Sequence, residues 1–248
     1  MHRFFVGHTA ISGSRAMLEG DVAHQIARVL RLRAGEKVVL LDGAGLEYEL
    51  SLTDVHQGRV EGVVTAKRAA QGDAAVPVTL FAALLKGDKL DTVLQKCTEL
   101  GVSAFVPFFS ERMLPQDGGP AWAGKRRERW SRIVKEASEV SRRGRLPEVH
   151  GPVTFAEACE MAGASAIIPW EEEAARGLRT ELAGNRERYA RGVGILIGPE
   201  GGFTAAEVET AKGRGATPVT LGRRIMRADT ASIAAVSAVM YELGELGS

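Results

Sequence analysis

The stretch Val193-Gly-Ile-Leu-Ile-Gly-Pro-Glu-Gly-Gly-Phe-Thr-Ala-Ala-Glu207 decides how the second half of this chain folds. Its first five residues form an apolar run, which is typical of a strand buried on both faces of a parallel sheet. Gly198–Gly202 then places three glycines in five residues. Thr204 with Glu207 has the spacing of a capping box at the start of a helix. The stretch therefore predicts a strand, a glycine-rich loop and a helix.

The glycine-rich loop is a candidate ligand site. Glycines let backbone N–H and C=O groups approach a ligand without a Cβ in the way. The spacing matches neither GxGxxG nor GxxxxGK(S/T), so the dinucleotide and phosphate-loop fingerprints are both absent. A plain tight turn between strand and helix is the alternative. The residues by themselves leave the ligand open.

The sequence predicts strands and helices in alternation from Pro77 to the C-terminus, on both sides of this stretch. We expect strands at 78–85, 104–109, 166–170, 193–197 and 218–221, and helices at 88–100, 125–140, 172–190, from 204, and at 230–243. This alternation predicts an α/β fold with a parallel sheet covered by helices on both faces. In such sheets ligands bind beyond the carboxyl ends of the strands.

The N-terminal part has a different pattern, with short strands expected at 3–6, 36–41, 46–53 and 59–65 and a helix at 21–30. Several short strands in about 65 residues favour a small β-barrel. Residues 69–77 are small and polar and end in proline, as linkers do. We therefore expect two domains, 1–72 and 73–248.

Composition limits the class of protein. Hydrophobic residues make up 45% and charged residues 25%, the net charge is +1, and the two cysteines form no CxxC pair. The N-terminus lacks the apolar run of a signal peptide, and no apolar stretch reaches the length of a membrane span. The five histidines show no metal-ligand spacing. We expect a soluble, cytoplasmic protein without a metal or a membrane partner.

The charges are unevenly distributed. Residues 122–150 hold nine Lys or Arg against four acids, a local excess of five positive charges. Such a cluster fits a phosphate footprint, because each neutralised phosphate releases counterions. A solvated helix face is the alternative.

A second strand exit, meaning the segment where the chain leaves an expected strand, is Leu221-Gly-Arg-Arg-Ile-Met-Arg-Ala-Asp-Thr-Ala-Ser232. Three arginines beside a buried helix start are costly unless they meet an anion or carboxylates. Asp229 or Thr230 is expected to cap the last helix. A surface loop with a capping Asp is the alternative. The exit Pro169-Trp170-Glu171 is a weaker candidate.

Six segments together resemble the 16S ribosomal RNA N3-uridine methyltransferases, the RsmE family of the SPOUT superfamily. They are His2-Arg-Phe-Phe5, His24 with Val29–Glu36, Lys96–Val102, Glu139–Arg143 with Arg145 and Pro147, Ile197–Gly202, and Leu221–Arg227 with Thr230-Ala231. One segment alone would be weak evidence, whereas six in this order are specific and cover nearly the whole chain.

The resemblance implies a PUA-like RNA-binding barrel at 1–72 and a SPOUT domain at 73–248 with a deep trefoil knot near 195–235. It also implies a homodimer and S-adenosylmethionine as cofactor, held among the loops of the knot. The cofactor-binding residues implied are Pro169, Trp170, Glu171, Ile197, Gly198, Pro199, Gly201, Gly202, Leu221, Gly222, Ile225, Met226, Arg227, Thr230 and Ala231.

The chain departs from the family pattern in two places. Glu139 is followed by Val140 where the family has Glu-Gln, and Arg227-Ala-Asp-Thr230 stands where the family has Arg-Thr-Glu-Thr. The second change keeps a carboxylate but shortens it by one methylene, so a contact by Asp229 must be reached differently.

The reaction implied is methylation of N3 of a decoding-region uridine in 16S rRNA of the small ribosomal subunit. It needs an in-line methyl group, removal of the N3 proton and stabilisation of charge on the uracil oxygens. We expect Arg227, and Arg143 of the partner subunit, to stabilise that charge or the phosphate. Asp229 or Glu200 is the candidate proton acceptor, with helix capping and loop bracing as the respective alternatives.

Basic residues are expected to hold the RNA backbone. The RNA-binding residues expected are Arg3, His24, Arg28, Arg31, Arg33, Arg142 and Arg145. Two other functions stay open, a SPOUT methyltransferase with another RNA target and a non-catalytic RNA-binding factor of ribosome assembly. A nucleotide hydrolase is disfavoured because the phosphate-loop lysine is missing.

Overall fold

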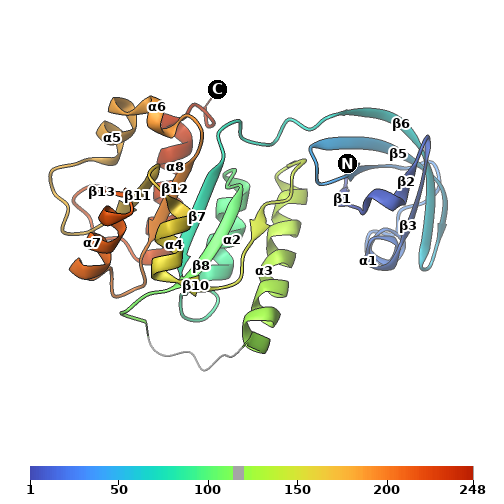
Figure 1. The fold of residues 1–248 in the computed structure, drawn as a ribbon. Coiled ribbons are helices and arrows are strands. Elements are labelled where there is room, and N and C mark those ends of the chain that lie inside the picture. The colour runs from blue at the N-terminus through green and yellow to red at the C-terminus, as the bar shows by residue number, and fades with distance from the viewer. Residues whose placement is uncertain (114–119, 248) are drawn as a thin grey trace. The chain divides into compact units, whose positions relative to one another are not determined.

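The computed structural model describes residues 1–113 and 120–247. The chain divides into two compact units, Met1–Asp73 with Ser138–Leu146, and Ala74–Ala137 with Pro147–Ser248 (Figure 1). A domain boundary between 72 and 73 stays a proposal, because 138–146, far along the chain, belongs to the first unit by its contacts.

The first unit is built on a six-stranded sheet in the order β1-β4-β5-β6-β3-β2. Its strands are β1 Arg3–Phe5, β2 Ile11–Ser12, β3 Arg15–Glu19, β4 Lys37–Leu41, β5 Leu46–His56 and β6 Arg59–Ala69. Only the β1–β4 pairing within this sheet is parallel. The expected strands in β1, β4, β5 and β6 are confirmed, whereas β2 and β3 were not predicted.

The expected helix at 21–30 is α1, Gly20–His24, which continues into the π-helical turn η2, Gln25–Val29. Its Ala23 and Ile26 are buried in one cluster with Phe4, Leu40 and Leu50 of the strands. This cluster is the apolar core of the first unit.

The segment 138–146 is tied to the first unit through Asp73. The Asp73 carboxylate accepts hydrogen bonds from Arg143 Nε at 3.3 Å, Gly144 N at 3.1 Å and Arg145 N at 3.0 Å. Gly45 N donates to Gly144 O at 3.2 Å. Backbone and side chain together therefore hold this late segment on the early strands.

The second unit contains a seven-stranded, wholly parallel sheet in the order β10-β8-β7-β12-β11-β13, with β9 paired to β8. The strands are β7 Val78–Ala83, β8 Ala104–Phe109, β9 Glu148–Val149, β10 Val153–Thr154, β11 Ala166–Pro169, β12 Val193–Ile197 and β13 Thr217–Val219. The predicted α/β fold with a parallel sheet is confirmed.

Helices cover both faces of this sheet (Figure 1). They are α2 Lys89–Glu99, α3 Pro120–Val140, α4 Phe155–Ala162, α5 Leu178–Gly184, α6 Arg186–Tyr189, α7 Ala205–Gly213 and α8 Ala228–Glu242. Successive residues of a strand point to opposite faces of the sheet, so Leu80 packs in one apolar cluster and Phe81 in the other. This double burial explains why the strand sequences are continuously apolar.

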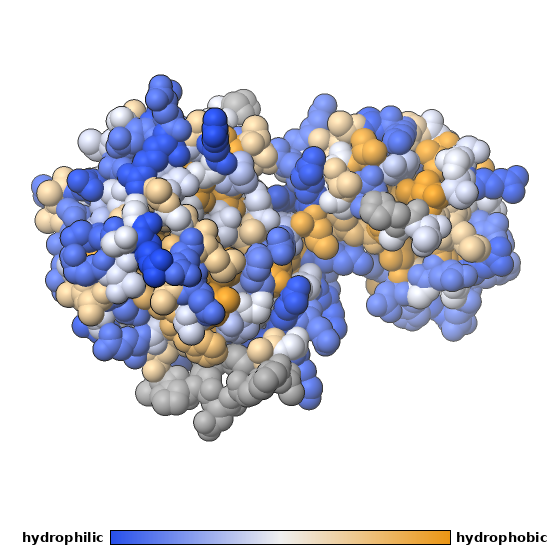
Figure 2. Space-filling view, in the orientation of Figure 1, coloured by the Kyte–Doolittle hydropathy of each residue, from blue (hydrophilic) through white to orange (hydrophobic). Residues whose placement is uncertain are grey.

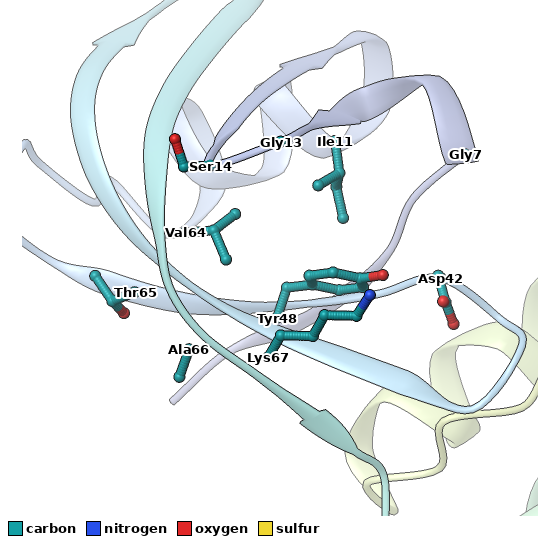
Figure 3. A pocket seen from close by; sticks show the side chains of 10 residues that line it. All are labelled: Gly7, Ile11, Gly13, Ser14, Asp42, Tyr48, Val64, Thr65, Ala66 and Lys67. Atoms are coloured by element: carbon teal, nitrogen blue, oxygen red, sulfur yellow. The ribbon is translucent and has the colours of Figure 1, made fainter.

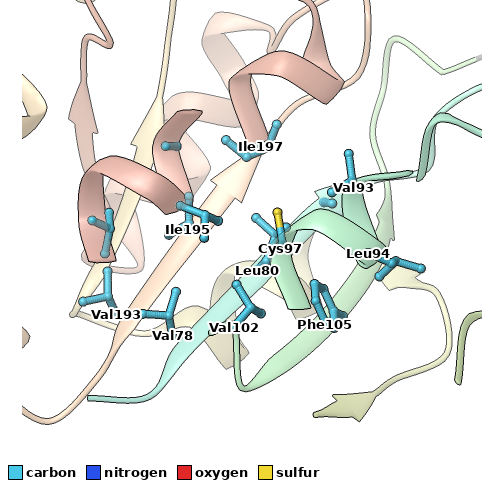
Figure 4. Close-up of a cluster of buried hydrophobic side chains, with 14 of the residues drawn as sticks. Val78, Leu80, Val93, Leu94, Cys97, Val102, Phe105, Val193, Ile195 and Ile197 are labelled. Carbon is cyan, nitrogen blue, oxygen red and sulfur yellow. The ribbon is translucent and has the colours of Figure 1, made fainter. Parts of the chain in front are cut away.

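The larger cluster joins β7 and β12 to α2 and α8 (Figure 4). Leu80, Ile195 and Cys97 of α2 all belong to this cluster, and burial raises the pKa of the Cys97 thiol to about 12. Cys97 is therefore a core residue with an unreactive thiol.

No helix in the described ranges is both long and apolar enough to cross a bilayer. Figure 2 shows hydrophilic side chains interspersed with apolar ones over the visible face of each unit.

Candidate functional site

Three neighbouring strands of the second unit end at one edge of the sheet. β11 lies between β12 and β13, and all three run parallel. The loops that follow them line a cavity of about 480 Å³. The three strand exits that the sequence singled out therefore meet at one site, at the carboxyl edge where parallel sheets bind ligands.

Most of the residues expected to bind the cofactor line this cavity. They are Pro169, Trp170, Glu171, Ile197, Gly198, Pro199, Gly202, Leu221, Gly222, Ile225, Met226 and Ala231. Gly201, Arg227 and Thr230 are not among the residues that line it. The binding role of each residue stays a prediction.

Further lining residues were not predicted as cofactor ligands. They are Glu173, Ala174, Glu200, Phe203, Thr220, Arg223, Arg224 and Ala228. The sequence did carry a signal for two of them, because Arg223 and Arg224 stand in the arginine-rich exit that needs anionic partners.

The start of α7 fixes the glycine-rich loop. Thr204 Oγ1 accepts from Glu207 N at 3.2 Å, and Glu207 Oε2 accepts from Thr204 N at 2.9 Å, so the predicted capping box is confirmed. Glu207 Oε1 also accepts from Ser110 Oγ at 2.8 Å and Glu111 N at 2.9 Å. One buried carboxylate thus ties the helix start to the exit of β8.

Position 202 favours glycine. Its φ is +68°, which strains most other residues, and a Cβ there would lie 3.1 Å from Glu171 Oε1, so the Glu171 side chain would have to shift. The loop after β12 and the loop after β11 therefore approach each other closely at this point.

The loop after β13 is held by backbone hydrogen bonds. Thr220 N donates to Arg176 O at 2.8 Å, and Leu178 N donates to Thr220 O at 3.1 Å. Beyond this anchor Gly222 has a φ of +111°, and Ile225 is 81% exposed although it lines the cavity. An apolar side chain in so open a place is free to cover a ligand.

Glu200 braces the glycine-rich loop. Its Oε1 accepts from Lys89 Nζ at 2.9 Å and from Lys86 N at 3.4 Å. Burial raises the pKa of Glu200, but the hydrogen bonds from Lys89 and the backbone outweigh it and hold the pKa below its ordinary value. A carboxylate that is paired and more acidic than usual is a weak proton acceptor.

Asp229 does not cap the last helix. The N-cap position of α8 is Arg227, without a side-chain cap, so the expectation that Asp229 or Thr230 caps this helix is wrong. Asp229 instead lies in the first helical turn, half-buried, and nothing in the described residues donates to its buried Oδ1. A buried carboxylate oxygen without a donor is available to accept a hydrogen bond from a ligand.

The two arginines of the predicted mechanism differ in exposure. Arg227 is exposed beside the start of α8. Arg143 belongs to the first unit, is 3% exposed and pairs with Asp73. Burial lowers the pKa of Arg143 and the Asp73 charge opposes that shift. The pairing with Asp73 gives Arg143 a structural role in the first unit. The catalytic roles of Arg143 and Arg227 stay predictions.

Most of the residues expected to bind RNA are accessible. The exposed ones are His24, Arg28, Arg31, Arg33, Arg142 and Arg145. The side chain of Arg3, by contrast, is 13% exposed and forms an ion pair with buried Glu47, which also pairs with Arg68. Arg3 therefore holds the strands of the first unit together.

Within residues 1–113 and 120–247, no group of three or more His, Cys, Asp or Glu is arranged to hold a metal ion. The expected absence of a metal stays a prediction.

Family models match both units. The RNA methyltransferase domain family matches residues 73–240, and the RNA methyltransferase PUA domain family matches residues 18–65. The class of protein is thus an RNA methyltransferase with a PUA domain.

Similar proteins and a solved structure identify the family within the RNA methyltransferases. The chain is 31% identical to ribosomal RNA small subunit methyltransferase E of Bacillus subtilis, over 98% of this chain and 97% of that one. It is 34% identical to the protein of that name from Synechocystis, over 96% of this chain and 77% of the relative. The crystal structure of a ribosomal RNA small subunit methyltransferase E from Neisseria gonorrhoeae, bound to S-adenosyl methionine, is 31% identical with a TM-score of 0.86 and 97% coverage of both chains.

The chain belongs to the ribosomal RNA small subunit methyltransferase E family. Its fold is that of a SPOUT methyltransferase domain with a PUA-like N-terminal unit. The trefoil knot near 195–235 stays a prediction.

Proposed function

We propose that this protein transfers a methyl group from S-adenosylmethionine to N3 of a decoding-region uridine in 16S rRNA. The observation that carries the proposal is the cavity of about 480 Å³ at three adjacent strand exits. Support comes from the family and from the Neisseria gonorrhoeae relative that was crystallised with S-adenosyl methionine. We further propose that the protein acts in the cytoplasm as a homodimer on the small ribosomal subunit.

The residues at the cavity fit this cofactor. Its volume lies within the range of small-molecule sites. Ile197, Leu221 and Ile225 offer apolar walls for the adenine ring, and the glycines of the loop leave backbone groups free to bind it. The carboxylates of Glu171 and Glu173 suit the positive charges of the ligand. When bound, S-adenosylmethionine supplies an electrophilic methyl group.

The chain's own residues have three tasks in this reaction. Asp229 accepts the N3 proton, because its Oδ1 is buried and has no donor among the described residues. Arg227, exposed at the N-cap of α8 two residues earlier, stabilises the charge that develops on the uracil oxygens. Glu200 braces the loop through Lys89. Arg143 of the partner subunit is the further candidate for binding the uridine phosphate.

The target atom sets a condition on the substrate. N3 lies on the Watson–Crick edge of uracil, so the base has to be unpaired or flipped before it can be methylated. The enzyme therefore acts on a uridine that the folded RNA leaves accessible.

Mass mapping of small-subunit rRNA from a strain that lacks the gene tests the proposal. We expect the loss of one methyl group at a decoding-region uridine, restored by the intact gene but not by an Arg227→Ala variant that still binds S-adenosylmethionine in calorimetry. An unchanged methylation map in the deletion strain would refute the proposed reaction. A chain that binds no S-adenosylmethionine would instead be a non-catalytic RNA-binding factor.

A further inference from the structure

A second cavity, of about 560 Å³, lies within the N-terminal unit (Figure 3). The β2–β3 turn with Ser14 borders it on one side, and the hairpin of β5 and β6 borders it on the other. Ser14 O accepts from Val64 N at 2.9 Å, which joins the two sides. This cavity is formed entirely by the first unit and contains no residue of the methyltransferase cavity.

Tyr48 is the aromatic side chain that lines this cavity. It is half-buried and packs against the apolar core of the unit, so its ring is held in place. Figure 3 shows Ile11 of β2 pointing toward the ring from the other side of the cavity, and Val64, from the same hairpin as Tyr48, pointing into the cavity. A flat ligand between the ring and Ile11 would have an aromatic face on one side and an apolar side chain on the other.

A cation lies over the ring. Lys67 lies opposite Tyr48 in the pairing of β5 and β6, and its Nζ is 5.2 Å from the ring centroid. Lys67 is exposed, so its ammonium group can move from the ring face to the phosphate of a ligand whose base takes its place.

The charges argue against a bare anion as the ligand. Asp42 also lines the cavity, and its Oδ1 is held by Ala44 N at 2.8 Å and Leu46 N at 3.0 Å. Residues 1–73 hold nine Lys or Arg and nine Asp or Glu, and segment 138–146 of the same unit adds three Arg against one Glu. The unit's net charge of +2 is too small to attract phosphate strongly by itself. Binding here has to come from short-range stacking, with the lysine as a single charged contact.

We propose that this cavity binds one unpaired nucleotide of an RNA, with its base stacked on Tyr48 and its phosphate at Lys67. The inference rests on the proposed function in so far as that function supplies an RNA substrate. Base–aromatic stacking tolerates any base, because every base has a π-face. Asp42 adds an acceptor for an N–H group on the base. Bases inside an A-form duplex are not free to stack in this way, so the site selects single strands.

Fluorescence anisotropy of the full chain with a labelled ten-nucleotide single-stranded RNA, and with a duplex of equal length, tests this site. Tyr48→Leu should weaken single-strand binding about 5- to 150-fold, the usual effect of one stacked base, and leave duplex binding unchanged. Tyr48→Phe should bind like wild type. Lys67→Gln should reduce the salt slope of single-strand binding by about 0.7, the value for one phosphate contact.

Lys37→Gln is the matched control, because Lys37 lies in the same unit, pairs with Glu49 at 2.7 Å and does not line the cavity. Tyr48→Trp provides an independent signal, since the chain's three tryptophans all lie beyond residue 120. Single-stranded RNA should quench this added fluorescence and the duplex should not. Thermal unfolding and calorimetry with S-adenosylmethionine establish that each variant is folded.

Equal single-strand affinity of Tyr48→Leu and wild type, or an equal loss of duplex affinity, would overturn the nucleotide site. So would a wild-type chain that methylates small-subunit rRNA but does not bind the short single strand. In each of these cases the proposed function stands. A wild-type chain that neither binds RNA nor methylates rRNA would refute the proposed function itself.

Discussion

Asp229 is the residue on which the proposed chemistry depends most. Its Oδ1 is buried, and no described residue donates to it. We predict that Asp229→Asn lowers kcat about 100- to 10,000-fold, the usual contribution of a general base. S-adenosylmethionine affinity should stay within about twofold, because Asp229 does not line the cofactor cavity. Single-turnover methylation and calorimetry measure the two effects, and wild-type turnover in this variant would exclude Asp229 as the proton acceptor.

Glu200 makes a different kind of prediction, one about pH. Hydrogen bonds from Lys89 and the backbone outweigh the effect of burial and lower the pKa of Glu200. The carboxylate therefore stabilises the fold fully above the ordinary glutamate pKa, and this contribution is lost as the pH falls through the lowered one. Because the Glu200 side chain is 31% exposed, its ion pair contributes only about 0.2–1 kcal/mol.

Urea unfolding compares the free energies of unfolding of wild type and Glu200→Gln at pH 7 and at pH 3. We expect the variant to be slightly less stable at pH 7 and as stable as wild type at pH 3. The variant should also bind S-adenosylmethionine more weakly at pH 7, since the loop that Glu200 braces lines the cavity. Glu209→Gln is the matched control, because it removes a surface ion pair with Lys212 that lies away from this loop. A difference in the free energy of unfolding that is equal at both pH values would contradict the lowered pKa of Glu200.

The sequence predicted the residues that line the cavity better than it predicted their partners. Twelve of the fifteen expected cofactor residues line one cavity, because each follows a buried parallel strand and such strands end at a common edge. The sequence could not predict the pairing of Glu200 with Lys89 or of Arg3 with Glu47. Those partners are far apart in the chain and meet only through the tertiary fold.

At the scale of elements, the start of α7 connects stability to the site. We predict that Thr204→Ala costs about 0.5–2 kcal/mol, the usual effect of losing a helix cap. Glu207→Ala should cost more, because Ser110 Oγ and Glu111 N lose their acceptor in a buried place. Denaturant unfolding measures both variants.

Helix α4 supplies the control for that experiment. Thr154 and Glu157 form the same kind of capping box there. Glu157 is exposed, and its carboxylate accepts hydrogen bonds from Thr154 N and Thr154 Oγ1, whereas Glu207 also accepts from Ser110 and Glu111. Glu157→Ala should therefore cost less than Glu207→Ala. An equal cost would show that the link to Ser110 and Glu111 contributes nothing.

The elements that the sequence analysis missed carried signals of their own. Thr154 and Glu157 have the spacing that located α7, and Ala16 and Leu18 alternate with exposed residues as a half-buried strand does. The charged stretch expected as one helix over 172–190 is instead two short helices, α5 and α6. Asn185 lies between them with a φ of −129°, which is not helical.

At the scale of the whole molecule, the sequence order does not follow the division into units. Residues 138–146 join the first unit although they come after the first strands of the second. The basic run at 122–150 gave no hint of this, because the anchor is Asp73, about seventy positions earlier. Local patterns predict elements, whereas contacts between distant segments require the fold.

The distribution of exposed arginines leads to a prediction about RNA binding by the whole protein. Arg28, Arg31 and Arg33 are exposed on the first unit, whereas Arg3 is engaged with Glu47. We predict that RNA affinity falls steeply with salt and that Arg31→Gln reduces the logarithmic salt slope by about 0.7–0.9. Arg3→Gln should lower the thermal midpoint and leave the slope unchanged, because its guanidinium is not free for phosphate. Binding of small-subunit rRNA fragments between low and moderate salt measures both variants, and a wild-type affinity that does not change with salt would contradict the role of these arginines.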